Sequence, residues 1–190
     1  MKKEQIDKLM NHCGLPDSCS DVKLYETHIS WVILADHYAF KIKKPVKLSF
    51  LDFSTPGKRK HFCREEVELN RRLSPEMYLD VIHVTADMLG KKEAGSSGRV
   101  IDYAVQMKRM DNTLRMDRML GEGRVEAHHL ERLAQKIAEF HRNARIIKNA
   151  FHTTGFQEAY RDILNQVGFI EQEVGKNWAG KVLECIDRSN

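Results

Sequence analysis

The stretch from Val22 to Lys43 constrains the fold most strongly, because short runs of β-branched and aromatic residues fill it. The polar pair Asp36-His37 interrupts these runs, which is typical of short strands joined by turns. Pro45 follows and cannot donate a hydrogen bond to a neighbouring strand, so we expect it to end the last strand. The stretch therefore predicts consecutive strands in a meander.

A helix is predicted next, over residues 55–73. Its start is marked by Ser54-Thr55-Pro56, which combines a capping side chain with a proline suited to the first helical turn. Ser74-Pro75 is expected to close the helix, because the residue before a proline disfavours the helical conformation. One helix therefore follows the first group of strands.

The rest of the sequence changes from strand-like to helical. Two more strands are predicted over residues 79–87 and 100–109, and the loop between them is rich in glycine and serine. Beyond Met110 the pattern is helical, most clearly over residues 125–144 and 156–174.

Together these patterns predict an α+β fold with an antiparallel sheet and one helix in residues 1–110. A helical part is expected in residues 111–190, with the boundary near Asp111. The chain of 190 residues, with 42% hydrophobic and 31% charged content, is long enough for one core or two small lobes.

Composition also narrows the location and the partners. No apolar run is long enough to cross a bilayer and no signal peptide is recognisable at the N-terminus, so a cytoplasmic protein without membrane contact is expected. The net charge of +4 favours anionic partners such as nucleotides. Nucleic-acid binding through the basic runs 58–60 and 71–72 is ranked lowest, because such charges usually coat a solvated helix.

The cysteines are scattered and include no CxxC pair, which argues against a zinc site and against a disulfide framework. We expect all of them to be reduced thiols: Cys13, Cys19, Cys63 and Cys185.

One predicted strand presents a surface suited to a nucleotide. Side chains alternate along a strand, so Ala39, Lys41 and Lys43 share one face. The alanine leaves room for a flat base, and a lysine is a compact cation that can reach phosphates. The alternative is that the lysines face solvent on an edge strand.

The following helix offers a partner for this strand. On a helical wheel Glu66 falls in one stripe with Phe62, Leu69 and Leu73, which predicts that this carboxylate faces the core. A buried carboxylate needs a cation nearby, and Lys41 is the natural one. The alternative is that Glu66 lies at the margin of the stripe and reaches water.

A strand lysine paired with a helix glutamate, followed by a strand hairpin and a helical part, is the arrangement of a kinase amino-terminal lobe. The segments AFKIKKPVKLSFLDFSTPGKRKHFCREEVELN, YAVQMKRM and LAQKIAEFHRNA resemble bacterial kinase-like proteins related to aminoglycoside phosphotransferases, some of them fused to an ATP-binding P-loop domain. The resemblance covers roughly residues 22–144 and lies in order and spacing. It implies a protein-kinase-like N-terminal lobe followed by the start of a helical C-terminal lobe, with ATP and Mg as cofactors.

The resemblance also implies roles for individual residues. Lys41 would anchor the phosphates with Glu66 as its helix partner, and Lys43 is a second candidate because it shares the face. The turn over the phosphates would be formed by Thr27, His28 and Ser30, although this chain lacks the Gly-rich motif there. The backbone of Met107, Lys108, Arg109 and Met110 would form the linker that meets the adenine, beside Ala39.

The catalytic part of the family pattern is missing. Residues 145–190 contain no His-Gly-Asp or Asp-Phe-Gly, so no catalytic or metal-binding residue is assigned. We expect an ATP-binding portion that is inactive alone, either a fragment or a natural short form. The alternative is a non-catalytic, pseudokinase-like binding or regulatory module. Helix faces left without cover around Phe151, Phe156 and Phe169 predict a homodimer or a rearranged C-terminal region.

Overall fold

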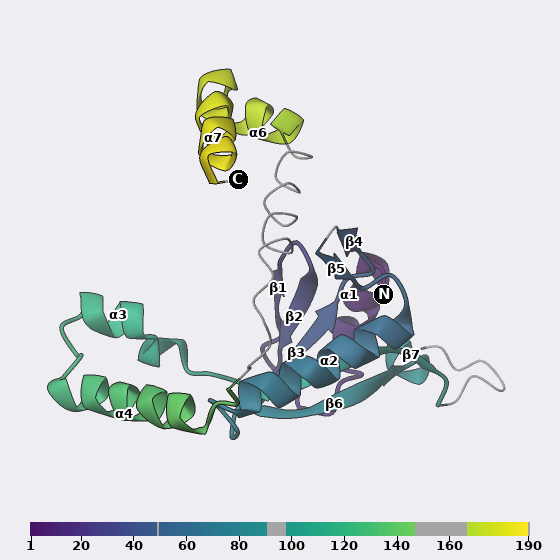
Figure 1. Cartoon of the computed structure of the whole chain (residues 1–190). Helices are drawn as coiled ribbons and strands as arrows, with labels where there is room; N and C mark the ends of the chain where they lie inside the picture. Colours follow the sequence, from purple (N-terminus) through teal and green to yellow (C-terminus); the bar gives the residue numbers. More distant parts are fainter. Residues whose placement is uncertain (49, 91–97, 147–166, 190) are drawn as a thin grey trace. The chain divides into compact units, whose positions relative to one another are not determined.

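A computed structural model of the protein describes residues 1–48, 50–90, 98–146 and 167–189 (Figure 1). The chain divides into two compact units, Met1–Ala144 and Arg145–Asn190, and each is described by itself. The predicted boundary between two lobes, near residue 110, falls inside the first unit. This division into lobes stays a prediction.

The first unit is built on a five-stranded antiparallel sheet in the order β1-β2-β3-β7-β6. The chain passes through three strands in succession, adds a small hairpin and a helix, and returns with the last two (Figure 1). The five strands are β1 (Lys23–Glu26), β2 (Ser30–Leu34), β3 (Tyr38–Lys43), β6 (Tyr78–Thr85) and β7 (Val100–Lys108). The hairpin pairs β4 (Lys47–Leu48) with β5 (Leu51–Asp52). The predicted meander and later strand pair are therefore confirmed, as is the α+β class.

One face of the sheet is covered by α1 (Lys3–Asn11), which supplies Ile6 and Leu9 to the larger core. These side chains pack with Phe40 and Ile42 of β3, and all four are fully buried. No helix was predicted over α1, although its apolar residues Ile6, Leu9 and Met10 recur at helical spacing. Its burial depends on contacts with strands far along the chain, which local periodicity does not report.

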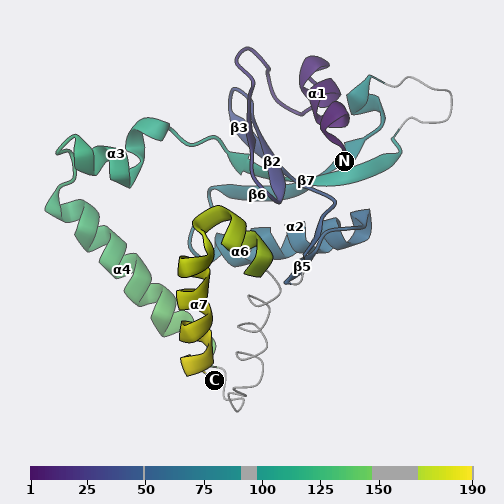
Figure 2. The same ribbon diagram turned by 90° about the horizontal axis from the view of Figure 1, so that it is seen from above.

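The opposite face is covered by α2 (Pro56–Arg71), as the second view shows (Figure 2). Its start is capped as predicted, since the Thr55 side chain accepts a hydrogen bond from the Lys58 N–H. Cys63 and Val67 pack against Val105 of β7 in a second, smaller core.

The predicted core-facing stripe of this helix is wrong at two positions. Leu69 and Leu73 are 58% and 40% exposed. The buried residues are instead Arg59, Cys63 and Val67, which repeat every four positions on the adjacent stripe. Glu66 lies next to that stripe and is half-buried, so a carboxylate does face the sheet although two leucines do not.

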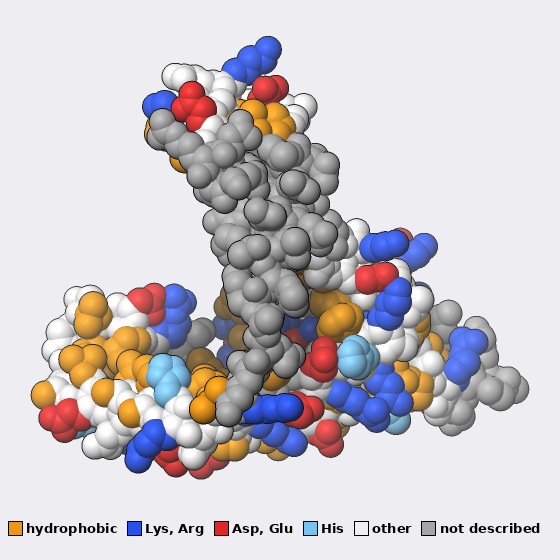
Figure 3. Space-filling model, in the orientation of Figure 1, with side chains coloured by type: hydrophobic (Ala, Val, Ile, Leu, Met, Phe, Trp, Pro, Cys, Tyr) orange, Lys and Arg blue, Asp and Glu red, His pale blue; other side chains and the backbone are white. Residues whose placement is uncertain are grey.

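Helical segments follow the sheet within the first unit. They are α3 (Met116–Gly121) and α4 (Ala127–Asn143), and the second confirms the helix predicted over residues 125–144. Hydrophobic side chains gather on the visible face of this pair (Figure 3). The exposed ones include Met116, Leu120, Leu130, Leu133 and Ile137.

The second unit contains α6 (Val167–Val174) and α7 (Lys176–Ser189), which pack on each other. The helix predicted over residues 156–174 agrees with α6 in its last part, while residues 156–166 lie outside the described ranges. Phe151 and Phe156, and the side chain of Phe169, also lie outside what the structure describes, so the predicted homodimer surface stays a prediction. In the described ranges, no helix combines the length and the apolar character that a bilayer crossing requires.

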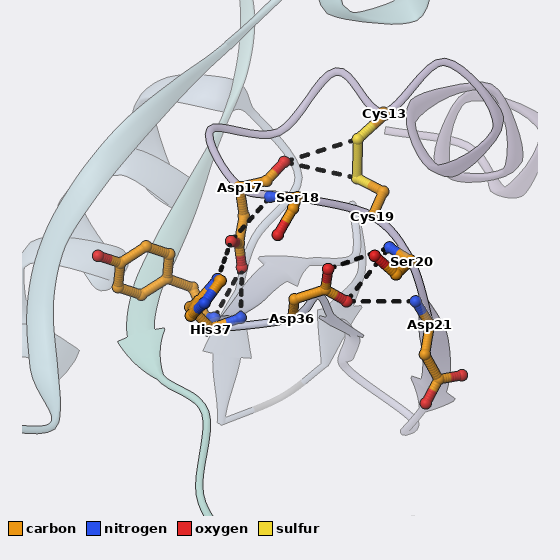
Figure 4. Close-up of a disulfide and its surroundings, with 9 residues drawn as sticks. Cys13, Asp17, Ser18, Cys19, Ser20, Asp21, Asp36 and His37 are labelled. Atoms are coloured by element: carbon orange, nitrogen blue, oxygen red, sulfur yellow. Dashed lines mark hydrogen bonds and ion pairs between the residues drawn. A yellow bond between two sulfur atoms is a disulfide. The ribbon is translucent and has the colours of Figure 1, made fainter.

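The connection between α1 and β1 contains a disulfide between Cys13 and Cys19 (Figure 4). The prediction of four reduced thiols is therefore wrong for this pair. The chain turns back at Cys13, whose φ of 46° is unusual for a residue other than glycine, and the two Cα atoms come within 5.9 Å. A spacing of six residues suits a disulfide once such a turn forms, and the search for CxxC pairs misses it.

Candidate functional site

The candidate site is a carboxylate of α2 that accepts hydrogen bonds from two lysines of β3. The Lys41 Nζ lies 2.7 Å from Oε1 of Glu66, and the Lys43 Nζ lies 2.6 Å from Oε2. The two lysines stand two positions apart on the strand and therefore point to the same side of the sheet, where α2 packs. The predicted contact between Lys41 and Glu66 is confirmed, and the second candidate lysine joins it.

The members of this cluster differ in burial. The exposed fraction of the side chain is 29% for Lys41, 14% for Glu66 and 7% for Lys43. The ammonium of Lys43 lies 4.8 Å from the ring centre of Phe53, which covers it on one side. Two cations and one anion leave a positive charge beside the sheet, and Lys41 is the member that solvent reaches most easily.

The surroundings keep the glutamate ionised. Burial raises the pKa of Glu66, whereas the hydrogen bonds from Lys41 and Lys43 lower it. The lowering is the larger effect, so the net pKa lies below its ordinary value. The nearby Cys63 has the opposite outcome, because burial raises the pKa of its thiol to about 11. Cys63 is therefore a neutral packing residue and not a nucleophile.

A second buried ion pair fixes the first half of α2. The Arg59 Nε donates to Oδ1 of Asp102 at 2.8 Å, and both side chains are buried between α2 and β7. Arg59 Nη1 also donates to the carbonyl oxygens of Phe53 and Ser54. The amine of Met1 lies 2.7 Å from Oδ2 of the same aspartate. The helix that carries Glu66 is thus attached to the sheet at two points.

Sequence reasoning missed this pair because Arg59 belongs to a run of basic residues that usually coats a solvated helix. A signal was present in Asp102, an acid in the otherwise apolar start of a strand. An acid in a buried strand requires a cation, as Glu66 does.

Of the three predicted residues near the phosphates, Thr27 and His28 lie in the turn between β1 and β2, and Ser30 is the first residue of β2. The Oγ1 of Thr27 accepts a hydrogen bond from the Ser30 N–H at 3.0 Å and lies 3.1 Å from the Ser30 hydroxyl, while His28 is exposed. Ser30 pairs with Lys43 in the strand register, so the turn lies at the end of β3 that carries this lysine. The two hydroxyls stabilise the turn itself, and their contact with phosphate stays a prediction.

The segment after β7 lines two cavities, of about 640 and 430 Å³. Both are bounded by the run Lys108, Arg109, Met110 and Asp111. The backbone N–H of Lys108 donates to Met77 and that of Arg109 donates to His37. Among the described residues, none accepts a hydrogen bond from the Met110 N–H, and Met110 is exposed.

The strand register places this segment next to the strand that carries the lysine cluster, although neither Ala39 nor Lys41 lines the two cavities. The buried Ala39 is the Cα partner of Met107, at the point where β7 leads into the segment. Lys41 follows two residues later on the same face, about 7 Å further along the strand. The predicted site residues of β3 and of the segment thus lie along one strand pair.

The resemblance to kinase-like proteins also implies a bound Mg. In the described ranges, no group of three or more histidine, cysteine, aspartate or glutamate side chains is arranged to hold a metal ion. The expected Mg therefore rests on the resemblance to kinase-like proteins.

Comparison with known proteins finds relatives whose names state no function. The chain is 34% identical over 124 residues to the uncharacterized protein Rv2004c of Mycobacterium tuberculosis and, equally, to the uncharacterized protein Mb2027c of Mycobacterium bovis. The match covers 65% of this chain and 23% of each relative, so the chain spans less than a quarter of their length. No family model and no solved structure matches.

Proposed function

We propose that this chain is the ATP-binding portion of a kinase-like small-molecule phosphotransferase, with Lys41 as the cation that meets the nucleotide phosphates. The observation that carries the proposal is the hydrogen bond of 2.7 Å between Lys41 Nζ and Glu66, made between a strand and the helix that covers it. A lysine held in this way keeps its direction, which is what an anchor for phosphate oxygens requires.

The topology supports the same proposal. In the kinase-like lobe that the sequence resembles, one helix sits between the third strand and a closing strand hairpin. Here α2 follows β3 and precedes β6 and β7, and the sheet order β1-β2-β3-β7-β6 brings β7 against β3. The strand that carries the lysine thus lies beside the strand that leads into the linker.

The base would lie beside this linker, against Ala39. Ala39 provides a small side chain at the start of β3, and the Met110 N–H provides a hydrogen-bond donor for the adenine edge. This is a narrower assignment than the whole linker, because the N–H groups of Lys108 and Arg109 already have backbone partners. Mg would be bound mainly through the phosphate oxygens and would neutralise part of their charge.

Binding, and not transfer, is what we propose for this polypeptide. Residues 145–190 lack the His-Gly-Asp sequence that orients the acceptor hydroxyl in the family it resembles. The activity of any longer protein that contains this portion, and its acceptor, are outside this proposal.

A non-catalytic binding module is the second candidate, and one observation favours it. The helix α4 exposes Leu130, Leu133 and Ile137 along one side, and apolar surface of this kind is typical of protein contacts, including a second copy of the chain. This candidate requires no nucleotide, so a nucleotide titration separates the two.

The test is a calorimetric titration of the chain with MgATP. Wild type and the control variant Lys8→Met, which changes an exposed lysine of α1 on the other face of the sheet, are expected to bind saturably and equally. Lys41→Met is expected to weaken binding about ten-fold or more, because it removes a charge-assisted contact to phosphate. Absence of binding to wild type, or equal affinity of the two variants, would overturn the proposal.

A further inference from the structure

The linker, residues 107–110, is joined to the turn between β2 and β3 by one residue, Arg109. Its backbone N–H donates a hydrogen bond to the carbonyl oxygen of His37 at 2.9 Å. Its side chain reaches further around the same turn, where Nη1 donates to the carbonyl oxygen of Ala35 at 2.7 Å. The main chain and the side chain of Arg109 therefore bind two carbonyl groups of one turn.

These two contacts lie where the sheet ends. The register of β3 and β7 stops at the pair Tyr38 and Lys108, so Arg109 is the first residue after the paired strands. Its side chain is 27% exposed, which partly shields the guanidinium from water that would compete for the Ala35 carbonyl. Arg109 thus attaches the linker at the point where strand pairing no longer does so.

The turn is itself held on its other side. The Asp17 carboxylate accepts hydrogen bonds from the backbone N–H groups of His37 and Tyr38, both at 2.8 Å (Figure 4). The side chain of Asp17 is only 3% exposed, and it belongs to the loop that Cys13 and Cys19 close. The turn therefore offers Arg109 acceptors whose positions are fixed.

Met110 comes directly after this attachment. It is exposed, and none of the residues that the structure describes accepts a hydrogen bond from its N–H. This N–H belongs to the planar peptide unit that begins at Arg109, so its direction follows the backbone of that residue. Whatever holds Arg109 in place also aims the Met110 N–H.

We propose that Arg109 is a positioning residue for base recognition, which holds the linker against the turn so that the Met110 N–H keeps its direction toward the adenine edge. This inference rests on the proposed function. Arg109 acts through Met110, because its own guanidinium is engaged by the Ala35 carbonyl. Lys41 serves the phosphates, so the two residues contribute to opposite ends of the nucleotide.

The test compares the affinities for MgATP and MgITP, the triphosphate of inosine. Ring atom N1 accepts a hydrogen bond in adenine and carries a hydrogen in hypoxanthine, so a fixed N–H donor at this edge distinguishes two bases that share the same phosphates. We expect wild type to prefer MgATP about ten-fold and Arg109→Met to prefer it less than about two-fold. Lys41→Met is expected to weaken both nucleotides and to keep the preference.

The matched control is Arg64→Met, which removes an exposed arginine of α2 and should keep the preference of wild type. A wild type that binds both nucleotides equally would overturn the inference, and so would a preference that Arg109→Met leaves unchanged. If Arg109→Met does not fold, Arg109→Gln takes its place.

A second measurement needs no nucleotide. Nitrogen relaxation of the backbone amides reports their order on the picosecond to nanosecond timescale. The Met110 amide is expected to be as ordered as the amides of β7 in wild type and in Arg64→Met, and more mobile in Arg109→Met. Equal order of Met110 in all three proteins would contradict the positioning role, even if Arg109→Met melts at a lower temperature.

The two measurements separate two kinds of failure. If wild type binds neither nucleotide, the proposed function fails, while the relaxation data still decide whether Arg109 fixes the linker. If wild type binds MgATP and Met110 is equally ordered with and without the arginine side chain, the positioning role alone fails.

Discussion

Arg59 of α2 and Asp102 of β7 form a buried pair in which Nε lies 2.8 Å from Oδ1 and Nη2 lies 2.9 Å from Oδ2. The two parallel contacts match the planar guanidinium to the carboxylate, so this pair is a bidentate polar link between the helix and the sheet. It fixes the position from which Glu66 reaches the lysines of β3.

The first prediction concerns this pair. Asp102→Asn leaves the buried Arg59 guanidinium and the Met1 amine without their anion, and we expect the free energy of unfolding to fall by about 3–5 kcal/mol. Urea unfolding followed by circular dichroism measures the loss. The matched control is Asp7→Asn, which breaks an exposed pair with Lys3 and should cost less than about 1 kcal/mol. Similar small losses in both variants would contradict the role given to Asp102.

The second prediction concerns pH. The folded pKa of Glu66 lies below its unfolded value, because the hydrogen bonds from Lys41 and Lys43 outweigh the effect of burial. The stabilisation is therefore complete above the unfolded pKa and is lost as the pH falls through the folded pKa. We expect the difference in unfolding free energy between wild type and Glu66→Gln to shrink as the pH is lowered from 7 to 3. A difference that stays constant over this range would contradict the assignment.

The third prediction concerns the disulfide. Cys13 and Cys19 close a short loop whose Asp17 carboxylate accepts hydrogen bonds from the backbone of His37 and Tyr38, which line the larger cavity (Figure 4). Reduction, or the double change to serine, is expected to lower the unfolding free energy by about 2 kcal/mol through the entropy of the unfolded chain. Thermal unfolding with and without reductant measures this, with Cys63→Ser as a variant that keeps the redox dependence. Identical melting in both conditions would argue against the crosslink.

The disulfide also bears on location. Such bonds are rare in reducing compartments, so the pair does not fit the expectation of a cytoplasmic protein, which stays a prediction.

The fourth prediction concerns Cys63. Burial raises the pKa of its thiol to about 11, so little thiolate exists near pH 8. In a Cys185→Ser variant, we expect Ellman's reagent to leave Cys63 unmodified in the folded protein and to modify it rapidly in guanidinium chloride. Fast modification under native conditions would show that the α2 face of the sheet opens easily.

The contact between Lys41 and Glu66 was predictable from the sequence because strand alternation and helical periodicity are local rules, and each placed one charged group toward the other element. The same rules could not choose between two neighbouring stripes of α2, so Leu69 and Leu73 were assigned to the core although they are exposed. Periodicity says which residues share a face, and only packing decides which face is covered.

Other features depend on distances that local patterns do not contain. In the sequence Arg59 resembles a solvent-exposed charge, because its partner Asp102 belongs to β7 and lies 43 positions later in the chain. Cys13 and Cys19 meet only because the chain reverses after α1, a helix that is itself stabilised by burial of Ile6 and Leu9. These are consequences of tertiary structure.

The most direct test of the nucleotide site is an amide NMR titration of the wild-type chain with MgATP. The account predicts saturable shifts of the Met110 and Asp111 amides together with the Lys41 ammonium, all with one dissociation constant. Shifts confined to the basic pair Arg71 and Arg72, or no saturable shift at all, would contradict it.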